Sequence, residues 1–273
     1  MIVFPNAKIN IGLNVIRKRD DGYHDIETIF YPVKLCDIIE ILQCPSGSHM
    51  PLFRNTGLPI EVPLSKNLCV KAYRLLQNDF KIPDISIHLH KIIPLGAGLG
   101  GGSSDAVSTM KLLNNLFSLG ISDGRILDYA LSLGSDCAFF TENRPVIAKG
   151  RGEILERILL NISGLHLIIV KPSFGISTVE AYSEVQPKFP QYSLVESIKQ
   201  PIDKWKEHIQ NDFEKSIFQK YPEIKRIKEE LYNMGAVFAS MSGSGSAVYG
   251  IFNENPEINN QFPGCFFWKG ILE

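Results

Sequence analysis

The stretch from Pro94 to Ala106 reads P-L-G-A-G-L-G-G-G-S-S-D-A, and five of its residues are glycine. Glycine has no Cβ atom, so the backbone here can adopt positive φ angles and approach a ligand closely. Apolar residues alternate before the stretch, from Ile85 to Leu89, and recur every three or four residues after it, as far as Phe117. This pattern predicts a strand, a glycine-rich turn and a helix in succession.

The start of the predicted helix favours a phosphate ligand. Ser103, Ser104 and Asp105 are good N-cap residues, and we expect them to open the helix. The first N–H groups of a helix have no partner within it, and its N-terminus carries a positive partial charge. A strand, a glycine turn and a helix N-terminus in this order therefore indicate a site for the phosphate chain of a nucleotide.

Three other interpretations of the turn are disfavoured. A Walker A loop needs a lysine after its last glycine, and here that position is Ser103. The dinucleotide fingerprint matches at Gly96, Gly98 and Gly101, but it needs an acidic residue at the end of the next strand, and Asp123 precedes a helix instead. A glycine-rich connection without a ligand would carry the backbone entropy cost of its glycines with no function to balance it.

Two further segments, together with the glycine-rich stretch, resemble the motifs of the GHMP kinases. Pro5 to Leu13 resembles their first motif, Pro94 to Ala106 the second, and Ser242 to Ala247 the third. The resemblance spans nearly the whole chain. It implies an α+β, two-domain GHMP kinase fold, with an S5-like N-terminal domain over residues 1–152 and a ferredoxin-like C-terminal domain over residues 153–273. The small residues of the third motif are expected to pack closely against the phosphate-binding loop.

Two short segments resemble one branch of that superfamily. Asp21-Gly22-Tyr23-His24 follows the first motif, and Leu133-Gly134-Ser135-Asp136 leads into a pair of phenylalanines. This branch phosphorylates a cytidine diphosphate sugar alcohol in the non-mevalonate isoprenoid pathway. The chain departs from it at Ala138, where the branch usually has proline, which changes the turn after Asp136.

The resemblance implies that Lys8 and Asp136 are the catalytic residues. Asp136 would receive the proton of the substrate hydroxyl, although its place after Gly134 also suits a helix N-cap. Lys8 lies on the polar face of a strand predicted from Ala7 to Val15, where a lysine is usually solvated. By resemblance it neutralises charge near the transferred phosphoryl group, because this chemistry depends chiefly on positioning and electrostatics.

The resemblance also assigns substrate-binding residues. Asn10 shares the polar strand face with Lys8. Tyr23 would stack on the cytosine ring while His24 hydrogen-bonds to its edge, and Tyr182 would cover the other side of the ring. Each aromatic residue also has a structural alternative: Tyr23 and His24 as loop side chains packed on the core, and Tyr182 as a core residue of a helix.

The implied phosphate donor is ATP, bound by the loop residues Pro94, Leu95, Gly96, Ala97, Gly98, Leu99, Gly100, Gly101, Gly102, Ser103 and Ser104. Asn67, Lys91 and Lys66 are further candidates for nucleotide contact. Ser103 and Ser104 suit either a phosphate or magnesium contact or simple helix capping. Mg²⁺ follows from the chemistry of ATP, and no residue is assigned to a metal because the sequence contains no cluster of metal ligands.

Composition sets the remaining expectations. The chain has 273 residues and a formal net charge of −1, which gives no bulk attraction to nucleic acid. Its five cysteines are odd in number and show no CxxC spacing, so reduced thiols are expected. No apolar run approaches the roughly 20 residues of a membrane span, and the N-terminus does not resemble a signal peptide. We therefore expect a cytoplasmic protein that acts on a small molecule, without nucleic-acid or membrane partners, as a monomer or weak homodimer.

Two alternatives and one structural expectation complete the predictions. Another GHMP kinase, of the homoserine or mevalonate type, is disfavoured by Gly22-Tyr23-His24, because a flat aromatic beside a polar edge suits a nucleobase. A non-enzymatic nucleotide-binding module is disfavoured by Lys8 and Asp136, provided that they meet in the fold. The stretch from Cys44 to Pro63 is rich in Pro, Gly and Ser and is expected to consist mainly of loops.

Overall fold

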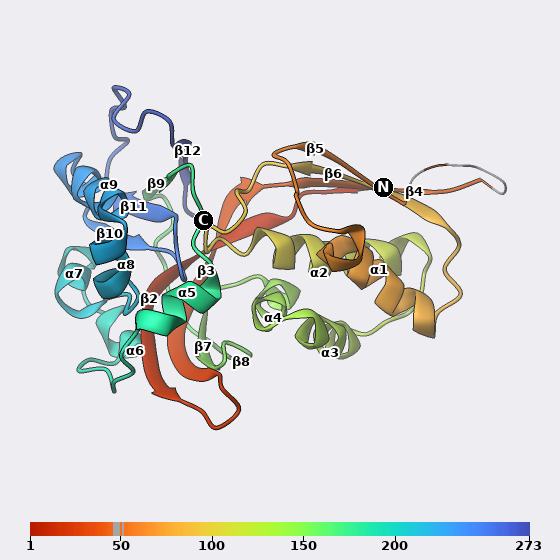
Figure 1. Ribbon diagram of the computed structural model, residues 1–273, viewed down its shortest axis with the longest axis horizontal. Helices are drawn as coiled ribbons and strands as arrows, with labels where there is room; N and C mark the ends of the chain where they lie inside the picture. Colours follow the sequence, from red (N-terminus) through yellow and green to blue (C-terminus); the bar gives the residue numbers. More distant parts are fainter. Residues whose placement is uncertain (46–49, 51) are drawn as a thin grey trace. The chain divides into compact units, whose positions relative to one another are not determined.

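The computed structural model describes residues 1–45, 50 and 52–273 of the chain. Helices and strands are mixed along it, which confirms the α+β prediction (Figure 1). The chain divides into two compact units. The first unit comprises Met1–Ala7, Leu35–Leu95 and Gly100–Asn143, and the second comprises Lys8–Lys34, Gly96–Leu99 and Arg144–Glu273. The units interleave along the sequence, whereas the predicted domains are contiguous, and the boundary between residues 152 and 153 stays a prediction.

The first unit is a sheet with helices on one side (Figure 1). The strand order in the sheet is β1-β4-β6-β5, in which β5 is parallel to β6 and the other pairs are antiparallel. Its strands are β1 (Ile2–Val3), β4 (Ile38–Gln43), β5 (Phe53–Gly57) and β6 (Ile85–Lys91). Its helices are η1 (Leu64–Lys66), α1 (Leu68–Asp79), α2 (Gly101–Leu116), α3 (Asp123–Leu133) and α4 (Ser135–Glu142). The predicted succession of strand, glycine turn and helix is therefore confirmed by β6 and α2.

Strand β5 lies in the stretch that was expected to form loops. Its residues Phe53 to Gly57 pair in register with Ile87 to Lys91 of β6. The sequence pattern did not predict β5, because its pairing partner β6 is distant in the sequence and β5 itself contains few strand-forming side chains. The rest of that prediction falls partly on residues 46–49 and 51, which lie outside the described residues.

The second unit contains two sheets, with strand orders β2-β3-β7-β8 and β10-β11-β9-β12. The strands of the first sheet are β2 (Asn6–Lys18), β3 (His24–Cys36), β7 (Val146–Gly150) and β8 (Ile154–Arg157). Those of the second are β9 (His166–Lys171), β10 (Phe238–Met241), β11 (Val248–Phe252) and β12 (Phe266–Ile271). The helical segments are α5 (Thr178–Glu184), α6 (Leu194–Ser197), η2 (Ile202–Lys204), α7 (Trp205–His208), α8 (Glu214–Lys220) and α9 (Pro222–Asn233). Strand β8 was not predicted.

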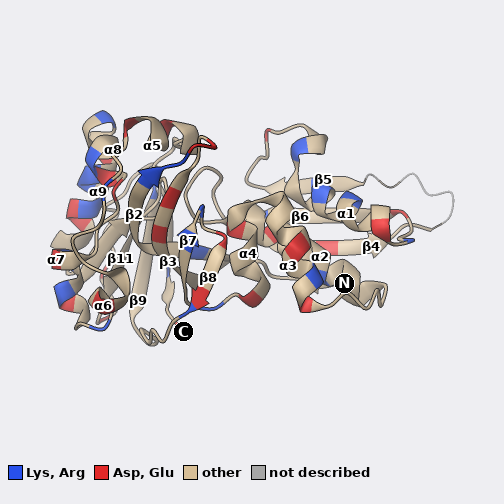
Figure 2. Ribbon diagram, turned by 90° about the horizontal axis from the view of Figure 1, so that it is seen from below, with Lys and Arg blue, Asp and Glu red and all other residues tan. Residues whose placement is uncertain are grey.

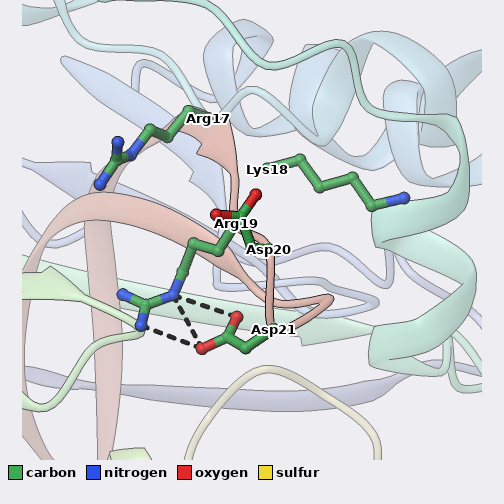
Figure 3. Close-up of a pocket in the computed structure, with 5 residues that line it drawn as sticks. All are labelled: Arg17, Lys18, Arg19, Asp20 and Asp21. Carbon is green, nitrogen blue, oxygen red and sulfur yellow. Dashed lines mark hydrogen bonds and ion pairs between the residues drawn. The ribbon is translucent and has the colours of Figure 1, made fainter.

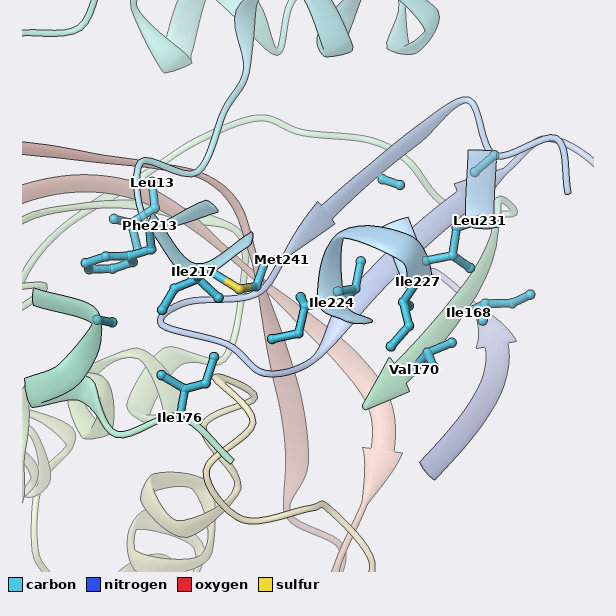
Figure 4. Close-up of a cluster of buried hydrophobic side chains, with 14 of the residues drawn as sticks. Leu13, Ile168, Val170, Ile176, Phe213, Ile217, Ile224, Ile227, Leu231 and Met241 are labelled. Atoms are coloured by element: carbon cyan, nitrogen blue, oxygen red, sulfur yellow. The ribbon is translucent and has the colours of Figure 1, made fainter. Parts of the chain in front are cut away.

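A cluster of buried apolar side chains joins helices α8 and α9 to the second sheet (Figure 4). On α9, Ile224, Ile227 and Leu231 are at most 3% exposed and recur at helical spacing, so they form one stripe that faces the sheet. Met241, at the end of β10, is part of the same cluster. The third sequence motif begins at the next residue, so this core fixes the point from which it departs.

Among the described residues, no helix combines the length and apolar character that crossing a membrane would require.

Candidate active site

The glycine-rich stretch combines left-handed turns with a helix N-terminus. Gly96, Gly98 and Gly100 have φ angles of 59°, 72° and 70°, a conformation that glycine adopts without strain. Helix α2 begins directly after Gly100, with Gly101 as its first residue. The N–H groups of the first turn point out of the helix without helical acceptors. This part of the chain therefore has the backbone geometry that a phosphate group requires.

The predicted caps of α2 are wrong. The N-cap is Gly100 in the left-handed conformation, and no side chain caps the helix. Ser103, Ser104 and Asp105 lie inside the helix instead, and Ser104 and Asp105 are 1% and 2% exposed. The helix starts earlier than expected because Gly100 reverses the chain direction and the next two glycines tolerate helical backbone.

A buried ionic cluster lies beside the start of α2. The Lys91 ammonium, 1% exposed, donates to the Asp37 carboxylate and to Oδ2 of Asp105 at 2.8 Å. Asp37 Oδ1 also accepts the backbone N–H groups of Ile92 and Ile93, at 2.6 and 2.8 Å. The ammonium of Lys91 thus supports the segment that leads into the loop. Its predicted contact with the nucleotide stays a prediction.

Asp105 is the less completely hydrogen-bonded carboxylate of this cluster. Its Oδ1 is buried without a hydrogen-bond partner, whereas Asp37 accepts three donors. Burial, opposed by Lys91 and reinforced by Asp37, raises the pKa of Asp105 to about 7. The ordinary pKa of this group is 3.8. Between these two pH values the Asp105 carboxyl therefore retains a proton in the folded protein that it releases in the unfolded chain.

The Asp105 carboxyl should make stability depend on pH. Because its pKa is raised on folding, its contribution to the free energy of unfolding is fully present below about pH 4 and is lost as the pH rises through about 7. The Asp105→Asn variant should lack this loss, so it should gain stability relative to the wild type between pH 5 and pH 8. Urea unfolding at both pH values measures the difference. If the free energy of unfolding changed by the same amount from pH 5 to pH 8 in the wild type and the variant, the prediction would be contradicted.

Asn67 and Lys66 occupy different environments at the start of α1. Asn67 is the N-cap of this helix, and its Oδ1 accepts the N–H groups of Cys69 and Val70 at 3.0 and 3.3 Å. Lys66 ends the short helix η1 and is exposed. The carbonyl oxygen of the Asn67 amide is therefore used in capping, and nucleotide contact by either residue stays a prediction.

The polar face of β2 is not solvated. Lys8 and Asn10 are 3% and 2% exposed, although they alternate with the apolar residues as expected. Lys8 Nζ donates to Oδ1 of Asn10 at 2.5 Å and to the carbonyl oxygen of Gly98 at 2.9 Å, and it lies 4.9 Å from the centre of the Phe30 ring. The backbone of Lys8 also bonds to Leu99. The first and second motifs therefore meet at the ammonium of Lys8.

The third motif reaches the same point. Ser242 Oγ donates to the Gly98 carbonyl at 2.9 Å and accepts the backbone N–H of Asn10 at 3.2 Å. Asn211, a buried residue outside the motifs, holds the motif by donating to the carbonyl oxygens of Met241 and Gly243 at 2.9 and 2.8 Å. The expectation that the third motif packs against the glycine-rich loop is confirmed.

Gly98 is the residue at which this packing leaves no space. A Cβ atom there would lie 1.9 Å from the carbonyl oxygen of Ser242. We expect Gly98→Ala to lower the free energy of unfolding by about 1–2 kcal/mol for its left-handed backbone alone, and further for the clash. Gly102→Ala is the matched control, because its Cβ would meet only Leu68 at 3.5 Å. Equal stability of the two variants in urea would contradict the packing described here.

Asp136 lies in the first turn of α4. The helix begins at Ser135 with Gly134 as its N-cap, so the predicted helix start is confirmed, while the cap is two residues earlier than Asp136. The next residue, Cys137, is buried, and its thiol hydrogen-bonds to Ser103 of α2. Burial raises the pKa of this thiol to about 11, against the effect of Ser103. The start of α4 is thereby held beside the first turn of α2.

The two predicted catalytic residues belong to different compact units, Lys8 to the second and Asp136 to the first.

The predicted cytosine-binding residues form a different arrangement from the one expected. The ring of His24 stacks on Tyr182, with centroids 4.7 Å apart and an interplanar angle of 22°. Tyr182 also meets Phe213 edge-on at 4.8 Å. Tyr23 is 58% exposed and has the Arg151 guanidinium 5.0 Å from its ring centre. Burial, followed by the charge of Lys18, lowers the pKa of His24. No sequence pattern predicted Arg151 or Phe213 at this place.

The hairpin turn before Tyr23 encloses an open hollow of about 320 Å³, lined by Arg17, Lys18, Arg19, Asp20 and Asp21 (Figure 3). Within it, Arg19 bonds to Asp21 at 3.1 Å and, beyond the lining, to Asp25 at 2.8 Å. The hydrogen bond from Arg19 lowers the pKa of Asp21, and the hydrogen bonds from Arg17 and then Arg19 lower the pKa of Asp25. The guanidinium of Arg19 is thus already paired with two carboxylates.

Comparisons with known proteins place the chain in a family. The GHMP kinases N terminal domain matches residues 67–143, and the GHMP kinases C terminal domain matches residues 194–261. The 4-diphosphocytidyl-2-C-methyl-D-erythritol kinases of Bacteroides fragilis (strain YCH46) and Bacteroides thetaiotaomicron are 48% and 51% identical to the chain, over 100% of each protein.

Solved structures agree with this placement. A crystal structure of 4-(cytidine 5'-diphospho)-2C-methyl-D-erythritol kinase matches with a TM-score of 0.78 and 28% identity, covering 100% of this chain and 99% of that one. A homoserine kinase from Cytophaga hutchinsonii matches with a TM-score of 0.62 at 16% identity, which shows a common fold alone. The predicted GHMP kinase fold is confirmed. The chain belongs to the 4-diphosphocytidyl-2-C-methyl-D-erythritol kinase family of the GHMP kinases.

Proposed function

We propose that this protein transfers the γ-phosphoryl group of ATP to a hydroxyl of 4-diphosphocytidyl-2-C-methyl-D-erythritol, in the non-mevalonate route to isoprenoid precursors. The observation that carries the proposal is the buried ammonium of Lys8, held against the Gly98 carbonyl of the glycine-rich loop. This buried positive charge lies where the glycine-rich loop meets the first and third motifs, which supports a role in phosphoryl transfer. Two proteins named 4-diphosphocytidyl-2-C-methyl-D-erythritol kinase match the chain over its full length.

In the proposed reaction the hydroxyl oxygen of the substrate bonds to the γ-phosphorus, and the bond from that phosphorus to the β,γ-bridging oxygen breaks. ADP leaves, and the proton of the hydroxyl passes to the carboxylate of Asp136. Lys8 stabilises the negative charge on the phosphoryl group during transfer. The dipole of α4 favours a carboxylate at the position of Asp136.

ATP is proposed to bind with its phosphates at the first turn of α2, where the N–H groups of Gly101, Gly102 and Ser103 have no helical acceptors. The preceding loop from Pro94 to Gly100, with Asn67 and Lys91, completes the proposed nucleotide site. Ser104 is also proposed for this site; it is buried, and its backbone N–H donates to the carbonyl oxygen of Gly100 at 3.0 Å.

Mg²⁺ is proposed to enter with ATP. In kinases it is held mainly by the phosphates and water, with one or two protein oxygens, and it neutralises charge on the phosphates. Within residues 1–45, 50 and 52–273, no group of three or more potential ligands among His, Cys, Asp and Glu is assembled. The hydroxyl oxygen of Ser103, in the first turn of α2, is a hard donor that fits such a sparse protein contribution.

The substrate base is proposed to bind beside Tyr23 and His24, with Tyr182 behind His24. In the described structure His24 and Tyr182 stack on each other, so the exposed face of Tyr23 is the aromatic surface open to a base. Asn10 was predicted to bind the substrate, but both ends of its amide bond to Lys8 and Thr28. We therefore propose that Asn10 acts chiefly by orienting Lys8.

Tyr23→Ala should weaken binding of the cytidine substrate about 10- to 100-fold, because stacking on an aromatic side chain contributes roughly 1–3 kcal/mol per base. The KM for ATP should change little. Tyr192→Ala is the control, since Tyr192 is also exposed but packs against His208. In initial-rate experiments, CMP should compete with the cytidine substrate and not with ATP. Failure of CMP to inhibit, or equal loss of both affinities in Tyr23→Ala, would contradict the cytidine site.

Further proposals concern partners and location. Lys and Arg on α8 and α9 are interspersed with Glu (Figure 2), as in the pairs Lys228–Glu214 and Lys225–Glu229. A surface that binds nucleic acid needs a continuous stripe of positive charge instead, so small molecules are the proposed partners.

All five cysteines are free, which fits the reducing cytoplasm that we propose as the location of the protein. A monomer or weak homodimer is proposed, and light scattering at micromolar concentration measures it.

A further inference from the structure

We infer that Thr28 is a positioning residue for phosphoryl transfer, which turns the Asn10 amide so that its oxygen faces Lys8. The inference rests on the proposed function, specifically on the role of Lys8. Thr28 lies on β3, outside all three motifs, and its side chain is 0% exposed. Its hydroxyl is therefore enclosed by protein groups whose donor and acceptor roles can be assigned.

The hydroxyl of Thr28 has one proton, and this proton is used. Thr28 Oγ1 donates to the carbonyl oxygen of Gly12 at 2.5 Å. The oxygen can then only accept from its other neighbour, the Asn10 amide, which it does from Nδ2 at 2.9 Å. An amide oxygen in that position would face a lone pair. Thr28 therefore selects the nitrogen end of the Asn10 amide.

The other end of the amide is selected by Lys8. An ammonium group can only donate, and Lys8 Nζ donates to Oδ1 of Asn10 at 2.5 Å. The Tyr249 hydroxyl bonds to the backbone carbonyl of Asn10 at 2.8 Å, so the main chain of Asn10 is fixed as well. Hydrogen-bond donation thus runs in one direction, from the Lys8 ammonium through Asn10 and Thr28 to the carbonyl oxygen of Gly12. The same ammonium also donates to the Gly98 carbonyl.

Loss of the Thr28 hydroxyl should disturb the direction of Lys8. Without the Thr28 hydroxyl, no acceptor holds the nitrogen end of the Asn10 amide at this place. Rotation of the amide by half a turn would then place its NH₂ group against the Lys8 ammonium. Lys8 would then lose one of its buried acceptors. Because the substrates are proposed to bind mainly through other residues, the effect should appear in kcat rather than in KM.

The first test compares variants of Thr28. Thr28→Val is nearly isosteric and should lower kcat about 10-fold, from the cost of an unpaired buried polar group, while both KM values stay within about threefold of the wild type. Thr28→Ala should have the same effect on kcat, and it serves if the valine variant does not fold. Thr28→Ser keeps the hydroxyl and should retain kcat within about threefold. Thr109→Val is the matched control, since Thr109 is equally buried but donates to the carbonyl of Asp105 at 2.8 Å.

The decisive measurement is a double-mutant cycle with Lys8→Met. If Thr28 acts through Lys8, Thr28→Val should cause no further loss of kcat in the Lys8→Met background. The same factor of loss in both backgrounds would overturn the inference, as would a serine variant as slow as the valine variant or a valine variant as fast as the wild type. Full activity of Lys8→Met alone would instead overturn the proposed role of Lys8, and with it the basis of the inference.

Discussion

The Asp136→Asn variant should have a kcat about 10²–10⁴-fold below that of the wild type, the usual effect of removing a general base. Asparagine fits the same place in the first turn of α4, but its amide does not accept the proton of the substrate hydroxyl. Affinity for ATP should change little, because the proposed phosphate site is built from backbone N–H groups of α2. Release of ADP in a coupled assay gives kcat, and calorimetric titration gives the ATP affinity.

A neighbouring helix supplies the control for Asp136. Asp123 is the acidic residue in the first turn of α3, and it is exposed. Asp123→Asn removes a carboxylate from an equivalent helical position in the same compact unit and should leave kcat within about twofold of the wild type. If Asp136→Asn behaved like Asp123→Asn, the carboxylate would have no role as a base, and positioning of the two substrates would account for catalysis.

The second large effect should come from Lys8. We expect Lys8→Met to lower kcat about 10²–10³-fold, the range for loss of one group that stabilises charge in the transition state. Methionine has a similar length and suits the buried position beside Phe30, so the fold should be retained. Circular dichroism and urea unfolding check the fold, and initial rates give kcat and both KM values.

Lys34→Met is the comparison for Lys8→Met. Lys34 is also on a strand of the second unit, but its side chain is 62% exposed and pairs with Glu273. Its kcat should stay within about twofold of the wild type. A Lys8→Met variant with wild-type kcat would show that the buried ammonium serves the structure alone.

Some features of the loop could be predicted because they depend on neighbouring residues. Gly96, Gly98 and Gly100 adopt the positive φ angles that glycine makes accessible, and β6 and α2 flank them as the apolar periodicity indicated. The capping prediction failed because Ser104 and Asp105 are buried inside the unit rather than placed at its surface. A capping preference is local, and the burial of Asp105 against Lys91 overrides it.

Other features of the site depend on partners far apart in the chain. Lys91 meets Asp37 across 54 residues, and Ser242 meets Asn10 across 232. Lys8 was identified only through its motif, and the buried polar face of β2 contradicts the solvated environment that alternation alone suggests. Thr28 had no distinguishing signal at all, because one threonine on a strand differs from another only in what surrounds it.

The aromatic residues illustrate a further limit of the sequence. Tyr23, His24 and Tyr182 were expected to surround a base, and in the second unit His24 and Tyr182 do come together. The sequence does not determine which rings stack on each other and which stay exposed, because that depends on side-chain rotations and on Phe213 and Arg151 nearby. Their roles in binding cytosine are therefore left to the test of Tyr23.

The proposed function is tested most directly by phosphotransfer from ATP to a panel of three acceptors: 4-diphosphocytidyl-2-C-methyl-D-erythritol, homoserine and mevalonate. The purified protein should form a phosphorylated product from the cytidine diphosphate compound, with kcat/KM at least about 10³-fold above that for the other two, because a site built to pair with polar groups rejects compounds that lack them. Comparable or higher kcat/KM with homoserine or mevalonate, or no transfer to the cytidine diphosphate compound, would contradict it.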